Sequence, residues 1–348
     1  MSAPRCRGSR RWPVCSRRRI VLSRLVTVLS LVMLTLTGRA RAWEIALEPQ
    51  VGFLVGGTSD GNRIDKAFEG YAAVSILEYP LNCPLAGGAV RIRAGRLAIV
   101  GNVMTNIDDP SGAVTDEDYF EANEDYVEAM GTPQKLVMSY TESATRARLL
   151  LADLGGRLRL MEHAGARGRI ALDLMLGYRH ELFVIDVYGA QGWRYVMVGD
   201  RPGPDDHRST VFAAEDSHLA HVVVQHMLPY VGLALEASWA GRLTLEGELR
   251  GLALISRVDD DHILREKMFE CLAGGAGVLA GLAARWRLTE PKRSLSVAIG
   301  PELELLYIYG VGVCEQRYYG WYRPWLPDHD FTASSLQLRM MVGARVGF

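Results

Sequence analysis

Long apolar runs are missing from most of this chain. After residue 42, no stretch approaches the roughly 18 consecutive apolar residues that a transmembrane helix requires. With 23% charged residues the sequence is too charged for a bundle of membrane helices, and with 49% hydrophobic residues it is too apolar for a disordered chain. Two classes remain open, a soluble folded protein and a membrane β-barrel.

An excess of charge of one sign is also missing. The formal net charge is -1, and no dense basic stripe occurs outside the extreme N-terminus. Nucleic-acid-binding proteins usually present a basic face, so we expect no nucleic-acid partner. The sequence also has no low-complexity tract and no interdomain linker, and a single domain is sufficient.

Cysteine is scarce, and its spacing fits no zinc site. Two of the five cysteines, Cys6 and Cys15, lie in the N-terminal segment, which leaves Cys83, Cys271 and Cys314. No pair has zinc-finger spacing. We expect neither a metal nor a cofactor.

The N-terminal segment predicts a signal peptide. Its first 19 residues are rich in arginine, an apolar run follows from Leu25 to Leu36, and Ala40-Arg41-Ala42 is a small-x-small cleavage pattern. A permanent anchor is the alternative, but the run is too short to span a bilayer. We expect residues 1–42 to be removed and residues 43–348 to form the mature domain.

The C-terminal residues alternate with the period of a β-strand. From Leu336 to Phe348, every second side chain is apolar, and the residues between them, such as Arg339 and Arg345, are mostly polar or small. This pattern, with its aromatic end, is typical of the terminal strand of an outer-membrane barrel. Similar alternation recurs in residues 170–178, 243–250 and 294–309. A soluble sandwich has the same period but buries its apolar face.

The sequence therefore predicts an all-β fold, an antiparallel transmembrane β-barrel in contact with the outer-membrane lipid of a Gram-negative bacterium. Short periplasmic turns and long outer loops are the usual asymmetry of such barrels. Tight turns are predicted at Asn82-Cys83-Pro84, around Gly165, at Trp239-Ala240-Gly241 and at Glu290-Pro291-Lys292. Long polar outer loops are predicted around residues 102–133, 200–217, 257–268 and 315–334.

Two short motifs in these polar segments have catalytic chemistry. Asp116 and Asp118 are two residues apart, as are Asp260 and His262, so each pair shares a face if its segment is extended. A carboxylate beside a histidine fixes its tautomer and suits it to remove a proton from water. Two neighbouring carboxylates can hold that water. Solvation of a loop is the alternative, as is a calcium site, although the EF-hand spacing is absent.

The residues around these motifs resemble the omptin family of outer-membrane proteases. Four landmarks appear in the family's order over nearly the whole mature chain: Ser75-Ile76-Leu77-Glu78-Tyr79, Thr115-Asp116-Glu117-Asp118-Tyr119, Leu228-Pro229-Tyr230-Val231-Gly232-Leu233 and Asp260-Asp261-His262.

The resemblance implies a barrel of about ten strands with a proteolytic groove at its outer rim. It implies that His262 activates a water and that Asp260 orients the His262 ring. Asp116 and Asp118 would position the water from the opposite wall. The substrates would be peptides or proteins at the cell surface. Neither a covalent acyl-enzyme nor a metal is implied.

The resemblance also implies a preference for basic residues next to the cut. Asp60 stands where the family has a pocket Glu, and Val258 stands where it has a second pocket acid. Glu142 is similar to the acid that favours a basic residue after the cut. Ordinary solvation is the alternative for Asp60 and Glu142.

A lipopolysaccharide site is poorly matched. Tyr178 fits the family's site on the outer wall, but His180, Leu182 and Gln225 stand where the family has charged residues. Lipopolysaccharide is therefore a doubtful partner at this place.

A non-catalytic barrel is the competing hypothesis, either an adhesin, a porin-like protein or a degenerate omptin. Acidic and basic residues at inward positions of the predicted strands, such as Glu246, Arg250 and Glu304, would fill a ten-stranded interior as a packed ionic network. Such a network argues against a wide pore. The presence of all four catalytic positions favours the protease.

The cysteines test the topology. Adjacent strands joined by a turn at Pro291 would bring Cys271 and Cys314 to the outer rim, within possible disulfide reach. Cys83, in an expected periplasmic turn, should stay unpaired.

Overall fold

The strands that the alternation predicts are present, and most of them are long. A computed structural model describes residues 43–68, 71–122, 127–128, 134–166, 168–195, 197–198, 201–202, 208–263, 266–289, 295–318 and 326–348. The expected signal peptide, residues 1–42, lies outside the described residues. One structural unit runs from Glu44 to Phe348.

The strands in chain order are β1 (Glu44–Phe68), β2 (Tyr71–Pro80), β3 (Cys83–Ala94), β4 (Leu97–Asn106), β5 (Val114–Ala122), β6 (Lys135–Gly165), β7 (Gly168–Tyr195), β8 (Met197–Val198), β9 (Arg201–Pro202), β10 (Arg208–Trp239), β11 (Leu243–His262), β12 (Lys267–Arg287), β13 (Ser296–Tyr318) and β14 (Leu326–Gly347).

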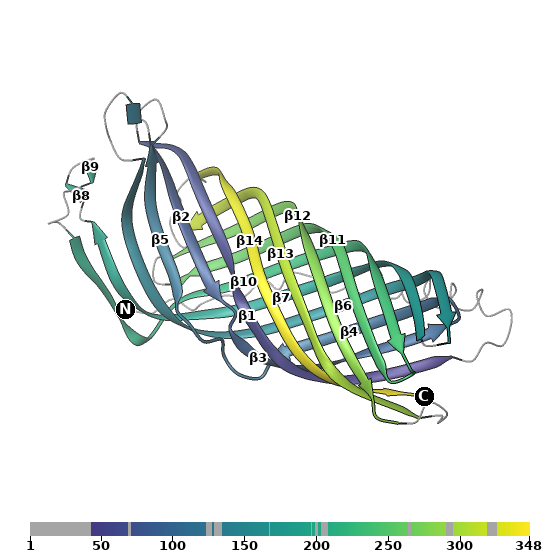
Figure 1. Ribbon diagram of the computed structural model, residues 1–348. Coiled ribbons are helices and arrows are strands. Elements are labelled where there is room, and N and C mark those ends of the chain that lie inside the picture. Colours follow the sequence, from purple (N-terminus) through teal and green to yellow (C-terminus); the bar gives the residue numbers. More distant parts are fainter. Residues whose placement is uncertain are drawn as a thin grey trace, which may run out of the picture. The chain divides into compact units, whose positions relative to one another are not determined.

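All strands except β8 and β9 form one antiparallel sheet that closes into a barrel (Figure 1). Each strand pairs with its neighbours in the order β14-β13-β12-β11-β10-β7-β6-β4-β3-β1, and β14 pairs with β1 to close the ring. β2 and β3 pair with successive parts of the same edge of β1. In the same way, β5 and β4 pair with successive parts of the same edge of β6. The ring therefore has ten positions, and the predicted all-β antiparallel barrel is confirmed.

Two of the predicted turns are confirmed. Gly165 ends β6, and only two residues separate it from the start of β7 at Gly168. Ala240 and Gly241 join β10 to β11 with φ angles of 47° and 65°, and the Arg242 amide donates to the Trp239 carbonyl at 3.0 Å. This left-handed pair suits a two-residue hairpin. The turn predicted at residues 290–292 lies entirely outside the described residues.

The turn predicted at Asn82-Cys83-Pro84 is wrong. Pro80 pairs with Gly57 and Cys83 pairs with Leu54, so the chain continues along β1 without reversing. Proline lacks the N–H that a ladder needs, so it marks an interruption of the strand pairing here rather than a hairpin. The reversal lies at Gly95, with a φ of 61°, between β3 and β4. Cys83 is free, as predicted, but it is buried in the core.

The outer loops are shorter in the structure than the polar segments of the sequence indicated. Residues 114–122 form β5, and β11 continues to His262, so both catalytic motifs lie on strands. The physical reason is the length of the wall. A strand crosses a membrane in about 9–11 residues, whereas β10 has 32 residues. Where the wall extends into water, polar side chains are compatible with strands on both faces.

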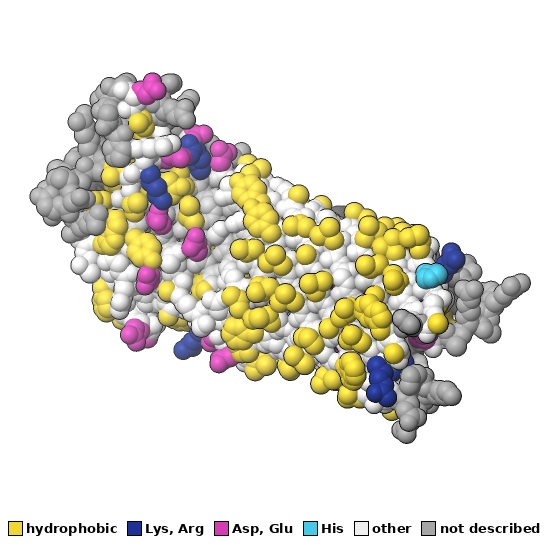
Figure 2. Space-filling view, in the orientation of Figure 1, with side chains coloured by type: hydrophobic (Ala, Val, Ile, Leu, Met, Phe, Trp, Pro, Cys, Tyr) yellow, Lys and Arg dark blue, Asp and Glu magenta, His cyan; other side chains and the backbone are white. Residues whose placement is uncertain are grey.

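An apolar belt surrounds the wall (yellow in Figure 2). Its outward side chains on β11 run from Leu245 to Ile255, and the outward pair Arg257–Asp259 follows. On β14, Leu336, Met340 and Val342 are exposed while Gln337 and Arg339 are buried inside, as the alternation predicts. Apolar residues outside with polar residues inside are the arrangement by which a barrel contacts lipid.

The lumen is filled rather than open. At the level of the belt, buried arginines and acids pair closely, including Arg157 with Glu246 and Glu248, and Arg285 with Glu48. The cavity among these residues has a volume of about 80 Å³, which is room for a few waters. Toward the outer end, an apolar layer replaces the ions. It includes Leu54, Leu81, Leu149, Phe183 and Val224.

Candidate active site

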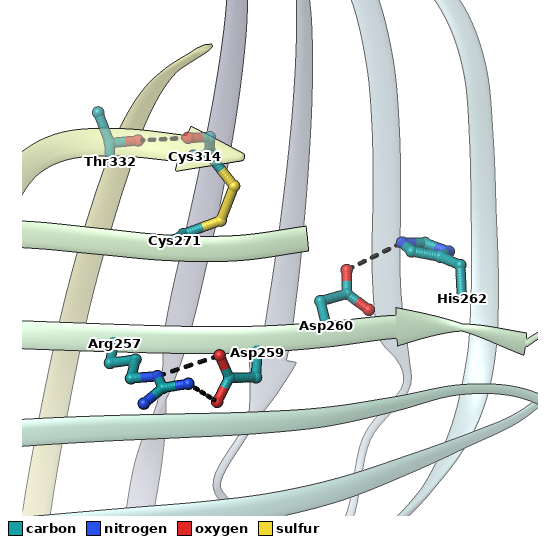
Figure 3. The surroundings of a disulfide bond; sticks show 8 residues. Arg257, Asp259, Asp260, His262, Cys271, Cys314 and Thr332 are labelled. Atoms are coloured by element: carbon teal, nitrogen blue, oxygen red, sulfur yellow. Dashed lines mark hydrogen bonds and ion pairs between the residues drawn. A yellow bond between two sulfur atoms is a disulfide. The ribbon is translucent and has the colours of Figure 1, made fainter. Parts of the chain in front are cut away.

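His262 and Asp260 form a close pair at the outer end of β11. His262 Nε2 lies 2.9 Å from Asp260 Oδ2, and both side chains are mostly buried. Figure 3 shows this pair on one side of the strand and Arg257 with Asp259 on the other. When Nε2 donates its proton to Asp260, Nδ1 is left as the acceptor. The geometry therefore provides an oriented imidazole that can take up a proton.

Phe269 of β12 packs against the side of the His262 imidazole. It lies directly opposite Asp260 in the strand register, and its ring packs edge-on against His262 with centroids 5.6 Å apart. An aromatic edge against the ring restricts its rotation and keeps water from that side. The sequence analysis did not assign this role to Phe269.

Asp116 and Asp118 share one face of β5, between β2 and β6. Ser139 Oγ donates to Asp118 Oδ2 at 2.7 Å, and Ser75 Oγ donates to Asp116 Oδ1 at 3.4 Å. Ser75 and Ser139 lie opposite Asp118 on the two neighbouring strands. These hydroxyls orient the two carboxylates, and the sequence analysis missed both serines.

A hydrogen-bonded bridge joins the two walls beneath these motifs. Thr58 Oγ1 of β1 lies 3.4 Å from His226 Nε2 of β10, and His226 Nδ1 lies 3.0 Å from Ser256 Oγ of β11. All three residues are buried. Thr58 is two residues before Asp60, and Ser256 is four residues before Asp260, so the bridge brings the walls that hold these acids together.

Acids from both walls affect the pKa of one buried phenol, that of Tyr79. The pKa of Tyr79 is raised well above its ordinary value by burial and, after that, by the charges of Asp260, Asp60 and Asp116. Charge effects fade over about 10 Å in salt solution and reach further in a buried site. The strand register places Asp60 and Asp116 diagonally beside Tyr79, and the charge of Asp260 on β11 also acts on its hydroxyl.

Asp60 faces into this space without a partner. Its side chain is 3% exposed, and neither carboxylate oxygen has a hydrogen-bond partner within the described residues. Burial and the charge of Asp260 raise the pKa of Asp60 well above its usual range. An unpaired buried carboxylate is costly, so the position is suited to receive a cation.

The wall beside Asp260 is apolar. Val258 is 2% exposed and lies opposite Cys271, which in turn lies opposite Cys314. The predicted disulfide between Cys271 and Cys314 is confirmed (Figure 3). The position two residues before Asp260 thus carries an aliphatic side chain, opposite the disulfide, instead of an acid.

The structure does not bring Glu142 to the groove. Glu142 lies opposite Thr115, and it accepts a hydrogen bond from Tyr140 at 2.7 Å on the exposed outer face. Asp116 lies opposite Thr141, on the other face. Glu142 therefore points away from the face that holds Asp116 and Asp118.

The residues compared with a lipopolysaccharide site lie together on the outer wall. Tyr178 and His180 stack with centroids 6.2 Å apart, and Leu182 lies opposite Gln225. Arginine and lysine are absent from these four residues.

Two searches of the described residues gave negative results. No helix there is long and apolar enough to cross a membrane. No group of three or more His, Cys, Asp or Glu side chains in the same residues is arranged to hold a metal ion.

The closed ring, the apolar belt and the filled lumen define the chain as an outer-membrane β-barrel, and the belt places it in the outer membrane of a Gram-negative bacterium.

Its fold is similar to that of the outer membrane protease OmpT from Escherichia coli, with a TM-score of 0.70 and 13% sequence identity, covering 89% of this chain and 99% of that one. The translocator domain of the autotransporter NalP from Neisseria meningitidis is 12% identical, with a TM-score of 0.29 and coverage of 94% and 96%. No family model and no curated protein sequence matches the chain. The chain thus shares its fold with an outer-membrane protease.

Proposed function

We propose that this barrel is an endopeptidase that hydrolyses peptide bonds with a water activated by His262. The observation that supports this most directly is the 2.9 Å contact between His262 Nε2 and Asp260, on the wall across the lumen from Asp116 and Asp118. Because the groove lies beyond the apolar belt, at the end of the barrel away from Glu44 and Phe348, its substrates are peptides or proteins at the cell surface.

The residues divide the reaction between the two walls. Asp116 and Asp118 hold a water, and His262 Nδ1 removes its proton as the oxygen attacks the peptide carbonyl. Asp260 stabilises the imidazolium that forms. The imidazolium then gives the proton to the leaving nitrogen, which releases an amine and a carboxylate. No bond forms between enzyme and substrate.

Asp60 supplies the preference next to the cut. Its two unpartnered oxygens would accept hydrogen bonds from a guanidinium, which presents its donors in a planar fork. Lysine is a compact, strongly hydrated charge and would gain less. We therefore expect Arg before the cut over Lys, and the apolar wall at Val258 should allow uncharged residues as well.

Digestion of a peptide library by the refolded barrel, read by mass spectrometry, tests the proposal. His262→Ala should lower kcat by about 10²–10⁴-fold, the usual contribution of a general base. His221→Ala is the matched control, because His221 forms a similar pair with Asp186, 2.7 Å apart, on the outer wall. Wild-type rates for His262→Ala would refute the mechanism.

A purely binding barrel, such as an adhesin, a porin-like protein or a degenerate omptin, is the alternative. The filled lumen disfavours a pore. An adhesin or a degenerate omptin would leave the library uncut by the wild type.

A further inference from the structure

Tyr79 has no role in the mechanism above, yet it is buried beside two acids of the candidate site. It is the second-last residue of β2 and only 1% exposed. Its strand partner is Thr58, the residue that bonds to His226 across the lumen. Tyr79 is therefore placed at the level where the two walls meet.

The strand register puts Tyr79 beside two of the acids. Leu77 pairs with Asp60 on β1 and with Asp116 on β5. Tyr79 lies two residues from Leu77 on the same face, so it is the diagonal neighbour of both acids. Diagonal neighbours are about 7–8 Å apart, which an aromatic side chain can reach.

The lumen closes directly beneath Tyr79. Leu54 and Leu81 are fully buried there, within one contiguous apolar cluster that also contains Tyr79. The bridge from Thr58 to Ser256 crosses the lumen at the same level. A side chain that enters the groove from the outer end therefore stops at the phenol.

We propose that Tyr79 is a specificity-determining residue: its ring forms the floor of the pocket between Asp60 and Asp260, and its hydroxyl binds an entering cationic side chain together with Asp60. This inference rests on the proposed endopeptidase function, because it assigns the residue that recognises the side chain before the cut.

The chemistry of a phenol suits this position. Its oxygen can accept a hydrogen bond from a guanidinium or ammonium, while its own O–H donates to a carboxylate. The neighbouring acids and burial raise the pKa of Tyr79, so the hydroxyl keeps its proton. Because Val258 stands on the wall in place of an acid, the hydroxyl of Tyr79 supplies a polar group beside Asp60.

Several charged or titratable groups lie on the inward faces of the strands around Tyr79. They are Asp60 from β1, Asp116 and Asp118 from β5, His226 from β10, Asp260 and His262 from β11, and His329 from β14. The acids outnumber the cationic groups, so the pocket favours a positive ligand.

A purely structural role predicts a different result from the same substitution. Tyr79→Phe keeps the ring that packs on Leu54 and Leu81 and removes only the hydroxyl. If the ring alone matters, the variant treats charged and uncharged substrates as the wild type does. If the hydroxyl binds the cation, only the charged substrate is affected.

The experiment compares two peptides that differ at one residue, arginine or its uncharged isostere citrulline, before the cut. Tyr79→Phe should lower kcat/KM for the arginine peptide by about ten- to hundredfold, the usual effect of losing a hydrogen bond to a charged group. The citrulline peptide should be cut as before. Tyr230→Phe is the control, since its hydroxyl donates to Asp153 at 2.7 Å, in the ionic part of the lumen.

Binding of the same peptides, fluorescein-labelled, to the His262→Ala background gives a readout without catalysis. The Tyr79→Phe change in that background should weaken arginine binding alone. An unchanged ratio of arginine to citrulline binding, or an equal loss for both, would overturn the proposal. Selective binding by a wild-type protein that cuts nothing would refute the endopeptidase and leave the role of Tyr79 standing.

Discussion

Thr58 and His226 meet across the lumen, with Thr58 Oγ1 3.4 Å from His226 Nε2. The ring's other nitrogen lies 3.0 Å from the hydroxyl of Ser256. One buried imidazole thus ties β1 to β11 through β10, directly below the candidate groove. The spacing between Asp60 and Asp260 depends on this tie.

We expect His226→Ala to loosen the groove without unfolding the barrel. The change removes the His226 partner of the buried Ser256 hydroxyl, which costs about 1–3 kcal/mol of unfolding free energy, while Thr58 keeps its bond to the Ser334 carbonyl at 3.0 Å. Urea titration of the refolded protein measures that loss, and peptide cleavage should fall about tenfold because misplaced walls weaken catalysis. His218→Ala on the outer wall is the control. Full cleavage by His226→Ala would show that the tie is not needed.

The preference for arginine should depend on pH through Asp60. Burial and Asp260 raise the pKa of Asp60, so its negative charge is lost as the pH falls through that raised value, earlier than for an ordinary aspartate. The ratio of arginine to citrulline cleavage should therefore decline toward acid pH. Asp60→Asn should give a low ratio at every pH. A wild-type ratio that stays constant from pH 5 to 8 would contradict the assignment.

Asp60 should also make the barrel less stable at high pH. The folded state holds the Asp60 proton more tightly than the unfolded chain does, because the folded pKa is the higher one. Stability from this group is thus present below the unfolded pKa and declines as the pH rises to the folded pKa. Asp60→Asn should be more stable than wild type at pH 8, with a smaller gain at pH 4. Urea titrations of both proteins at the two pH values decide this.

Cleavage should survive without lipopolysaccharide. His180, Leu182 and Gln225 are uncharged or weakly basic, and they stand where the family has charged residues. Charge-assisted hydrogen bonds to the lipid, worth roughly 1.5–3 kcal/mol each, are therefore missing from that wall. Rates in pure detergent, with and without added lipopolysaccharide, should agree within about tenfold. A protein that is inactive until the lipid is added would show that other residues bind it.

Removal of the disulfide should lower stability but leave the register intact. The bond links residues 43 apart, and closure of such a loop contributes at most about 4 kcal/mol. The double variant Cys271→Ser, Cys314→Ser should still fold, because the strands stay paired along their length. Non-reducing peptide mapping of the wild type should find Cys83 unbonded. A link from Cys83 to either partner would contradict the topology.

The sequence alone determined the barrel wall and the two candidate motifs, Asp116 with Asp118 and Asp260 with His262. Side-chain direction in a strand alternates locally, so the pattern from Leu336 to Phe348 was enough to assign its lipid and lumen faces. The pairing of His262 with Asp260 follows in the same way, because residues two apart on a strand share a face. The disulfide followed from two neighbouring strands joined by one turn.

Only the tertiary structure decided which residues lie opposite one another on neighbouring strands. The shift of each strand against the next is set by the whole ring, and a shift of one residue moves a side chain to the other face. Irregular pairing at Glu142 and Ala144 is one such shift. The polar loops predicted around Asp116 and Asp260 became strands because the wall extends beyond the lipid, and Tyr79 gained its place because Asp60 and Asp116 pair with the same leucine. None of these relationships is local in sequence, since each depends on how ten strands close into one ring.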